Sequence, residues 1–213
     1  MIPITVFFCG TLMPPVLGPL LNWGLTKAWK EAIVKTLPKT GLASLEETYQ
    51  ALARWLDSRI APDQPLTLVG QSQGGLHAVR LALDRPNVER VITISTAHHG
   101  TVLANFIPPL WDMRPESAYM KAYLARLPEV APRLDSIYLR HDLMIHPYHS
   151  AHVDDARNHL FASPEEYLVT GEHKIDTVRL DGNPNHISEL YNGPLIEALR
   201  LISINDNYGH IAV

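Results

Sequence analysis

The chain has 213 residues, 46% of them hydrophobic, and this length and composition fit one globular domain rather than two. Its 18 basic and 22 acidic residues give a formal charge of -4, which offers no basic surface for nucleic acid or an anionic membrane. One cysteine excludes an internal disulfide and fits a reducing compartment.

The first eight residues contain neither a charged segment nor a small-residue cleavage site, so they predict no signal peptide and a cytoplasmic location. A trimmed secreted form would look the same. No apolar run approaches the roughly 20 residues that span a bilayer, so no transmembrane segment is expected. The sequence carries no signature of the oligomeric state.

Residues 2–8 form a nearly continuous apolar run that ends at Gly10, as expected of a strand buried on both faces. The proline-rich segment 11–25 is predicted to be a loop over the strand ends, because proline removes a backbone donor. A short helix over 28–32 and a strand over 32–37 follow.

Ser44-Leu45-Glu46-Glu47 is a capping box, and apolar residues then recur at helical spacing, which predicts a helix to about Arg59. A second amphipathic helix follows Ser72. Six short apolar runs predict strands. They are 2–8, 32–37, 66–69, 91–94, 136–139 and 175–180.

Strands alternate with helical stretches along the whole chain. This alternation predicts a single α/β domain over 1–213, with an approximately six-stranded, mostly parallel sheet, helices on both faces and a ligand site outside the carboxyl ends of the strands.

The segment 101–134 is too long for an ordinary connection and is rich in proline and large apolar residues. Its second part, 116–127, is predicted to be a helix. We expect a small cap that lines an acyl pocket, with Leu12, Phe106, Trp111 and Met113 as substrate-binding residues. The alternative is that these side chains only pack on a sheet edge.

Gly70-Gln71-Ser72-Gln73-Gly74 lies between a buried-strand pattern and an amphipathic helix. This spacing is that of a nucleophile elbow, a sharp turn that lifts a serine above the strand ends. The residues two before and two after the serine must be small because the turn folds them against each other and against neighbouring strands. Ser72 is therefore the candidate nucleophile.

A serine needs an imidazole to take its proton and a carboxylate to orient that imidazole. On this scaffold the acid follows the serine and precedes the histidine. Asp142 comes just after the fifth strand and is the candidate acid, although an aspartate there could simply cap a turn. The other candidate acids are Asp112, Asp154, Asp155 and Asp181.

Eleven histidines compete for the role of base. His186 lies between the last predicted strand and the last predicted helix, where the base is expected. His173 precedes that strand, and His210 is followed by too few residues for a helix. His77, on the helix after Ser72, fits a partly buried histidine with satisfied hydrogen bonds better than a base.

The oxyanion that develops during attack needs two preorganised amides. One is expected from Gln73, which follows the nucleophile and opens a helix. The other is expected from Thr11 or Leu12, in the loop after the first strand.

Three segments, in order along the chain, resemble those of serine lipases and esterases of the α/β-hydrolase superfamily. Phe8-Cys9-Gly10-Thr11 resembles their His-Gly oxyanion motif. Residues 70–76 resemble their Gly-His-Ser-Gln-Gly-Gly elbow, and 94–101 resemble their Gly-Thr-Pro-His-His-Gly-Ser segment. The resemblance implies an α/β-hydrolase fold and favours Thr11 over Leu12 as the second oxyanion donor.

Further similarity to α/β-hydrolases lies at 114–117, at Asp142 with His146-Pro147, and at Asn185-His186-Ile187. The resemblance carries the triad over as Ser72, Asp142 and His186.

The sequence departs from this family at two positions. Cys9 replaces a histidine before the oxyanion glycine; strand-end cysteines are usually buried and inert, which argues against a thiol nucleophile. Gln71 replaces the histidine before the serine and either hydrogen-bonds neighbouring loops or has no role.

The histidines at 141, 146, 149 and 152 have spacings that could serve a metal, and some related lipases carry zinc. The group has no cysteine and no helical register, so we expect no metal. His98 and His99 are expected to hold the loop beside the elbow.

These features predict a carboxylic-ester hydrolase, an esterase or lipase, that forms an acyl-enzyme without a cofactor. Its expected partner is a small-molecule or lipid ester, and the short cap favours short or medium acyl chains. An acyltransferase or thioesterase with the same triad remains the alternative. An inactive binding module on this fold is a third hypothesis, because fold alone does not fix function.

Overall fold

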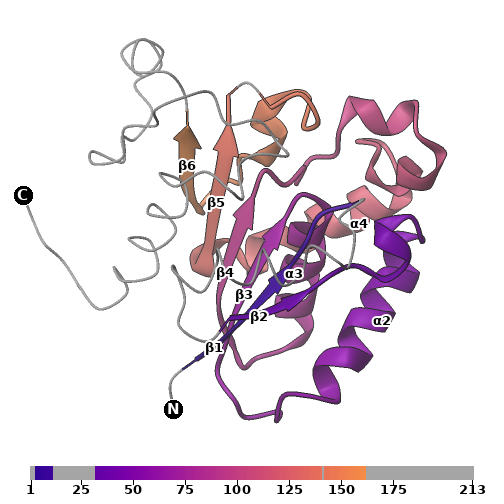
Figure 1. The fold of residues 1–213 in the computed structure, drawn as a ribbon. Coiled ribbons are helices and arrows are strands. Elements are labelled where there is room, and N and C mark those ends of the chain that lie inside the picture. Colours follow the sequence, from indigo (N-terminus) through magenta and orange to yellow (C-terminus); the bar gives the residue numbers. More distant parts are fainter. Residues whose placement is uncertain (1–2, 12–31, 141, 162–213) are drawn as a thin grey trace, which may run out of the picture.

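The computed structural model describes residues 3–11, 32–140 and 142–161. Its centre is a sheet of six strands in the order β2-β1-β3-β4-β5-β6, and all five pairings are parallel. The strands are β1 (Ile4–Phe8), β2 (Ala32–Lys35), β3 (Leu66–Gln71), β4 (Val88–Ile94), β5 (Leu134–Leu139) and β6 (Arg157–Phe161). Figure 1 shows them side by side.

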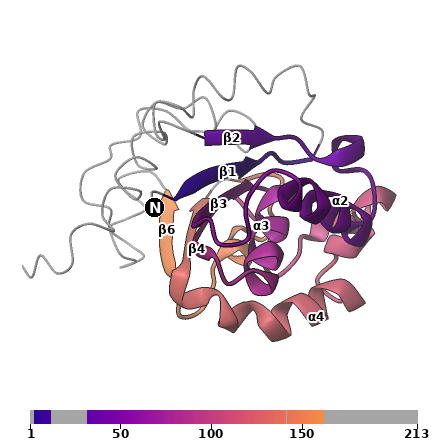
Figure 2. The same ribbon diagram turned by 90° about the horizontal axis from the view of Figure 1, so that it is seen from below.

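Three helices lie on the same side of this sheet: α2 (Leu45–Asp57), α3 (Gln73–Asp84) and α4 (Ala118–Arg126) (Figure 2). The Ser44 hydroxyl caps α2 by accepting from the backbone N–H of Glu47 at 3.1 Å, as the capping box predicts. Short 3-10 turns complete the described chain. They are η2 (Pro38–Gly41), η3 (Val102–Asn105), η4 (Pro108–Met113), η5 (Leu127–Glu129), η6 (Ala131–Arg133) and η7 (Tyr148–Ala151).

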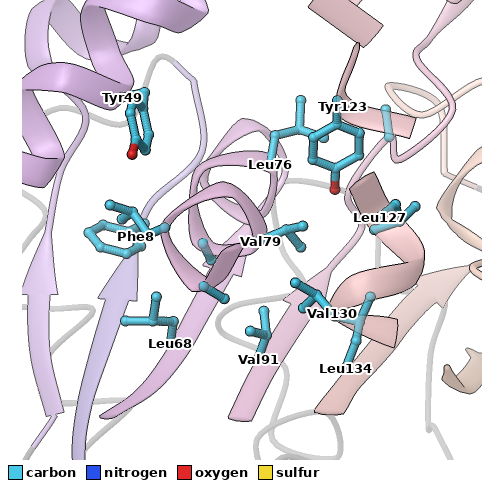
Figure 3. Packing of buried hydrophobic residues seen from close by; sticks show 14 of the residues in the cluster. Phe8, Tyr49, Leu68, Leu76, Val79, Val91, Tyr123, Leu127, Val130 and Leu134 are labelled. Atoms are coloured by element: carbon cyan, nitrogen blue, oxygen red, sulfur yellow. The ribbon is translucent and has the colours of Figure 1, made fainter. Parts of the chain in front are cut away.

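The core between sheet and helices is built around α3. Leu76 and Val79 of α3 lie between Leu68 and Val91 of the sheet and Tyr123 of α4 (Figure 3). Side chains at alternate strand positions point to the opposite face, and Phe7, Val69 and Ile92 there are also fully buried. Burial on both faces explains why these strands read as continuous apolar runs.

Five of the six predicted strands are confirmed, with ends that differ by up to three residues. The strand predicted at 175–180 lies outside the described residues. The sixth strand of the described sheet is β6 at 157–161, which the sequence pattern missed. The predicted helix over 28–32, apart from Ala32, and the predicted final helix also lie outside the described residues.

β6 was missed because its sequence is polar. Arg157 and His159 both contact the Asp135 carboxylate of β5. The Nη2 of Arg157 lies 2.7 Å from one carboxylate oxygen, and the Nε2 of His159 lies 2.9 Å from the other. Arg90 of β4 reaches the same carboxylate at 2.9 Å. Cross-strand polar and ionic contacts therefore hold β6 in the sheet, although β6 lacks the apolar pattern that predicts a strand.

In the part of the chain that the structure describes, no helix has the length and hydropathy needed to cross a bilayer. The single domain over 1–213 remains a prediction.

The buried Asp135 carboxylate is expected to make stability depend on acid pH. Burial opposes its ionisation, but hydrogen bonds from His159 and Arg157 and the charge of Arg90 outweigh burial and lower its pKa from 3.8 to about 2. The stabilisation is then complete above pH 3.8 and is lost as the pH falls through 2, an effect of about 2 kcal/mol. Urea unfolding between pH 7 and pH 2 measures it.

Asp135→Asn should flatten this acid dependence and lower the free energy of unfolding at pH 7 by about 3–5 kcal/mol, because buried Arg90 loses the negative charge that it faces. The control is Asp57→Asn, which removes an exposed partner of Arg85 and should cost at most about 1 kcal/mol. An unchanged acid slope in Asp135→Asn would contradict this account.

Two buried histidines differ in their hydrogen bonding. His77 of α3 is fully buried, and neither ring nitrogen has a partner among the described residues, so the expectation of a partly buried, satisfied side chain is wrong there. His98 is equally buried, but its Nε2 lies 2.9 Å from the Thr93 hydroxyl and its Nδ1 2.6 Å from the Tyr123 hydroxyl. Burial lowers the pKa of both histidines to about 3, so both are neutral near pH 7.

His77→Leu is expected to stabilise the protein by about 1–3 kcal/mol, because it removes a buried polar ring that makes no hydrogen bond. The matched variant His98→Leu should destabilise it, because the hydroxyls of Thr93 and Tyr123 each lose a partner. Equilibrium unfolding in urea at pH 7 compares the two, and the reverse order of stability would refute the prediction.

Candidate active site

Ser72 lies in the sharp turn between β3 and α3, with φ 55° and ψ -126°. A side chain in this left-handed region is strained by about 1–3 kcal/mol, so the surroundings must hold it. The Ser72 N–H donates to the carbonyl of Ile94 at 2.8 Å, and the Ser72 carbonyl accepts from the Gly75 N–H and the Thr96 hydroxyl, both at 3.0 Å. The local geometry is that of the predicted elbow.

The glycines of the elbow are required by close backbone packing. A Cβ atom on Gly70 would overlap the backbone of Gly74, and one on Gly74 would overlap the carbonyl oxygens of Phe8 and Cys9 at the end of β1. The start of α3 therefore lies directly against two strands, as the spacing of the motif predicts.

The backbone amides of Thr11 and Gln73, which lie beside Ser72, have no hydrogen-bond partner among the described residues. Gln73 is the first residue of α3, so its N–H cannot be satisfied within the helix and lies at the positive end of the helix dipole. These are the two residues expected to stabilise an oxyanion. Leu12, the alternative donor, lies outside the described residues.

Side chains on both sides of Ser72 hold the loop that carries Thr11. The amide oxygen of Gln71 accepts from the Gly10 N–H at 3.1 Å, and that of Gln73 accepts from the Thr11 hydroxyl at 2.6 Å. Of the two readings of Gln71, the bond to a neighbouring loop is confirmed. Sequence reasoning could not name its partner, because Gly10 lies 61 residues away.

Asp142 is buried, three residues after the end of β5. Its Oδ1 accepts from the backbone N–H groups of Met144 at 2.8 Å and Ile145 at 2.9 Å, so it does cap a turn. These bonds also fix the carboxylate at the carboxyl edge of the sheet, where Ser72 follows β3. Its role as catalytic acid remains a prediction.

The alternative acids are placed differently. Asp112 accepts from the Leu45 N–H at the start of α2, and the Asp154 side chain is 97% exposed. Asp155 is exposed, and Asp181 lies outside the described residues. Of these four, none that the structure describes is both buried and at the end of a strand.

The candidate base His186 lies outside the described residues, as do His173 and His210. Because β6 ends at Phe161, both His173 and His186 follow the last described strand. Position after β6 therefore does not separate His173 from His186. The strand predicted at 175–180, which His173 precedes, and the Asn185-His186-Ile187 resemblance remain the features that favour His186.

Neither of the histidines beside the elbow resembles a base. His98 is fully buried, with both ring nitrogens engaged. His99 donates its N–H to the Ser150 carbonyl and places Nδ1 3.1 Å from the same oxygen. Both hold the loop after β4, as predicted.

The predicted substrate-binding residues differ in exposure. Phe106 is 78% exposed, Trp111 is 48% exposed, and Met113 is buried in the core. The helix of the predicted cap is confirmed as α4, which packs on α3 through Tyr123. The acyl pocket itself remains a prediction.

The histidine group gives no metal centre within the described ranges: no three His, Cys, Asp or Glu side chains there are placed to hold an ion. His141 lies outside those ranges. His149 instead packs edge-on against Tyr148, and His152 Nδ1 lies 3.1 Å from the Tyr138 hydroxyl.

No protein-family model matches the chain, and no curated protein is significantly similar to it. Solved structures do resemble it. Est1E from Butyrivibrio proteoclasticus is 14% identical, with a TM-score of 0.59 over 96% of this chain and 88% of that chain. A structure from work on LipS and LipT, two metagenome-derived lipolytic enzymes, is 15% identical, with a TM-score of 0.57 over 96% and 93%.

The fold is that of an α/β-hydrolase. Phospholipase PlaB from Legionella pneumophila also matches, at 13% identity and a TM-score of 0.45 over 58% of this chain, but the chain spans only 35% of that protein's structure. At such low identities the likeness shows the hydrolase fold alone, so the chemistry must be argued from the residues of the site.

Cys9 is expected to be chemically inert in the folded protein. Its side chain is fully buried, and burial raises the pKa of its thiol to about 12, so almost no thiolate exists at pH 8. Iodoacetamide at pH 8 should leave the native protein unmodified, and the same treatment in urea should add one label per chain. Rapid labelling of Cys9 in the native protein would contradict this environment.

Proposed function

We propose that the protein is a serine carboxylic-ester hydrolase, an esterase or lipase. The observation that carries the proposal is Ser72 in the strained elbow, beside the amides of Thr11 and Gln73, which have no hydrogen-bond partner among the described residues. A nucleophile next to two preorganised donors can form the tetrahedral intermediate of acyl transfer and stabilise its oxyanion.

In the proposed reaction, the Ser72 hydroxyl attacks the ester carbonyl while His186 takes its proton. The N–H groups of Thr11 and Gln73 stabilise the oxyanion. His186 then gives its proton to the leaving alkoxide, which produces the alcohol and an acyl-enzyme. Water, deprotonated by His186, then attacks the acyl carbon. The bond to Ser72 Oγ breaks, the acid is released, and Ser72 takes its proton back from His186.

Asp142 is assigned the orienting role in this proposal. Two backbone N–H groups hold its Oδ1, so the carboxylate is fixed before it meets an imidazole. A fixed carboxylate can select the imidazole tautomer and stabilise the cation that forms during attack.

Ser72→Ala is expected to lower kcat on p-nitrophenyl esters by a factor of about 10⁴ to 10⁶, because no other group can form the acyl-enzyme. A fluorophosphonate should label the wild-type protein on Ser72, as located by peptide mass mapping. Active protein labelled elsewhere, or full activity in Ser72→Ala, would refute the assignment. Esters of graded chain length then separate esterase from lipase.

His186→Ala should lower kcat as severely as Ser72→Ala, whereas His173→Ala should stay within about twofold of the wild type. The comparison is needed because both histidines follow β6. The opposite pattern would move the base to His173 and leave Ser72 as nucleophile.

Product analysis with added alcohol or thiol acceptors tests for acyl transfer to those acceptors in place of water, since hydrolysis at an unchanged rate argues against transfer.

A further inference from the structure

The side chain of Gln71 connects the strand before the nucleophile to the loop after β1. Gln71 is the last residue of β3 and is buried, and its Oε1 accepts from the Gly10 N–H at 3.1 Å. A Cβ on Gly10 would lie 2.6 Å from this oxygen and 3.0 Å from the Ser72 Cβ. The loop can approach Gln71 this closely only because residue 10 is glycine.

This bond determines which amide of the loop is left for a ligand. The Gly10 N–H is used by Gln71, and the next amide, that of Thr11, has no partner among the described residues. The Thr11 hydroxyl is tied to Gln73 on the other side of Ser72. The nucleophile and this loop are therefore linked by side chains that adjoin Ser72 directly.

We propose that Gln71 is a positioning residue for the oxyanion hole. Its amide oxygen holds Gly10 so that the N–H of Thr11, and not that of Gly10, faces the carbonyl under attack. The inference rests on the proposed ester hydrolysis and deepens it. Oxyanion donors act because they are already oriented when charge develops, so a loop that must reorganise stabilises the transition state less.

Gln71→Met tests the proposal, because methionine keeps the length of the unbranched side chain and cannot replace the amide oxygen as a strong acceptor. We expect kcat on a p-nitrophenyl ester to fall about tenfold or more, with KM within about twofold of the wild type. Gln71→His, whose ring nitrogen can accept from Gly10, should recover most of that loss.

A thionoester comparison separates positioning from a structural role. Sulfur in place of the carbonyl oxygen accepts hydrogen bonds poorly, so the ratio of kcat/KM for the ester over its thionoester reports on the oxyanion donors. Gln71→Met should lower this ratio. Thr48→Val alters a buried hydroxyl of α2 that has no hydrogen-bond partner among the described residues, and it should leave the ratio unchanged.

The outcomes distinguish the two proposals. If the wild type shows no hydrolysis that depends on Ser72, the proposed function fails, and the role of Gln71 fails with it. If hydrolysis depends on Ser72 but Gln71→Met keeps the kcat and ester preference of the wild type, only the positioning role is overturned. Should Gln71→Met not fold, Gln71→Asn makes the same test, because its amide is one methylene too short to reach Gly10.

Discussion

The whole site depends on the close backbone contact between the start of α3 and the end of β1. Gly74 lies so near the carbonyls of Phe8 and Cys9 that no side chain fits there, and Gly70 lies equally close to Gly74. This contact fixes the first turn of α3 against the sheet. It therefore places Ser72, the Gln73 amide and the loop after β1 together at the carboxyl edge of the sheet.

Side chains then refine what the backbone contact brings together. Gln71 and Gln73 flank Ser72 and hold Gly10 and Thr11, so one set of hydrogen bonds links the proposed nucleophile to the proposed oxyanion donors. A shift of Ser72 would carry the loop after β1 with it. This coupling suits the proposed reaction, whose donors must be oriented before charge develops.

The sequence predicts what depends on local pattern, and the structure adds what depends on distant partners. Apolar runs predict β1, β3 and β4, and glycine spacing predicts the elbow, because both patterns follow from local geometry. β6 could not be recognised, since its polar residues pair with Asp135, 22 residues or more away. The partner of Gln71, and the lack of a partner for His77 within the described part of the chain, likewise become visible only once the helices and strands are packed.

Strain and stabilisation lie at opposite ends of the same sheet. At the carboxyl ends, Ser72 adopts a positive φ that costs about 1–3 kcal/mol. Toward the amino end of β5, the Asp135 carboxylate binds Arg90, Arg157 and His159 and ties the last three described strands together. A strained turn persists only where its surroundings are rigid, and an ion network on β4, which adjoins β3, and on the two strands beyond it supplies rigidity without occupying the site. Loss of that network should therefore destabilise the fold well before it alters the chemistry at Ser72.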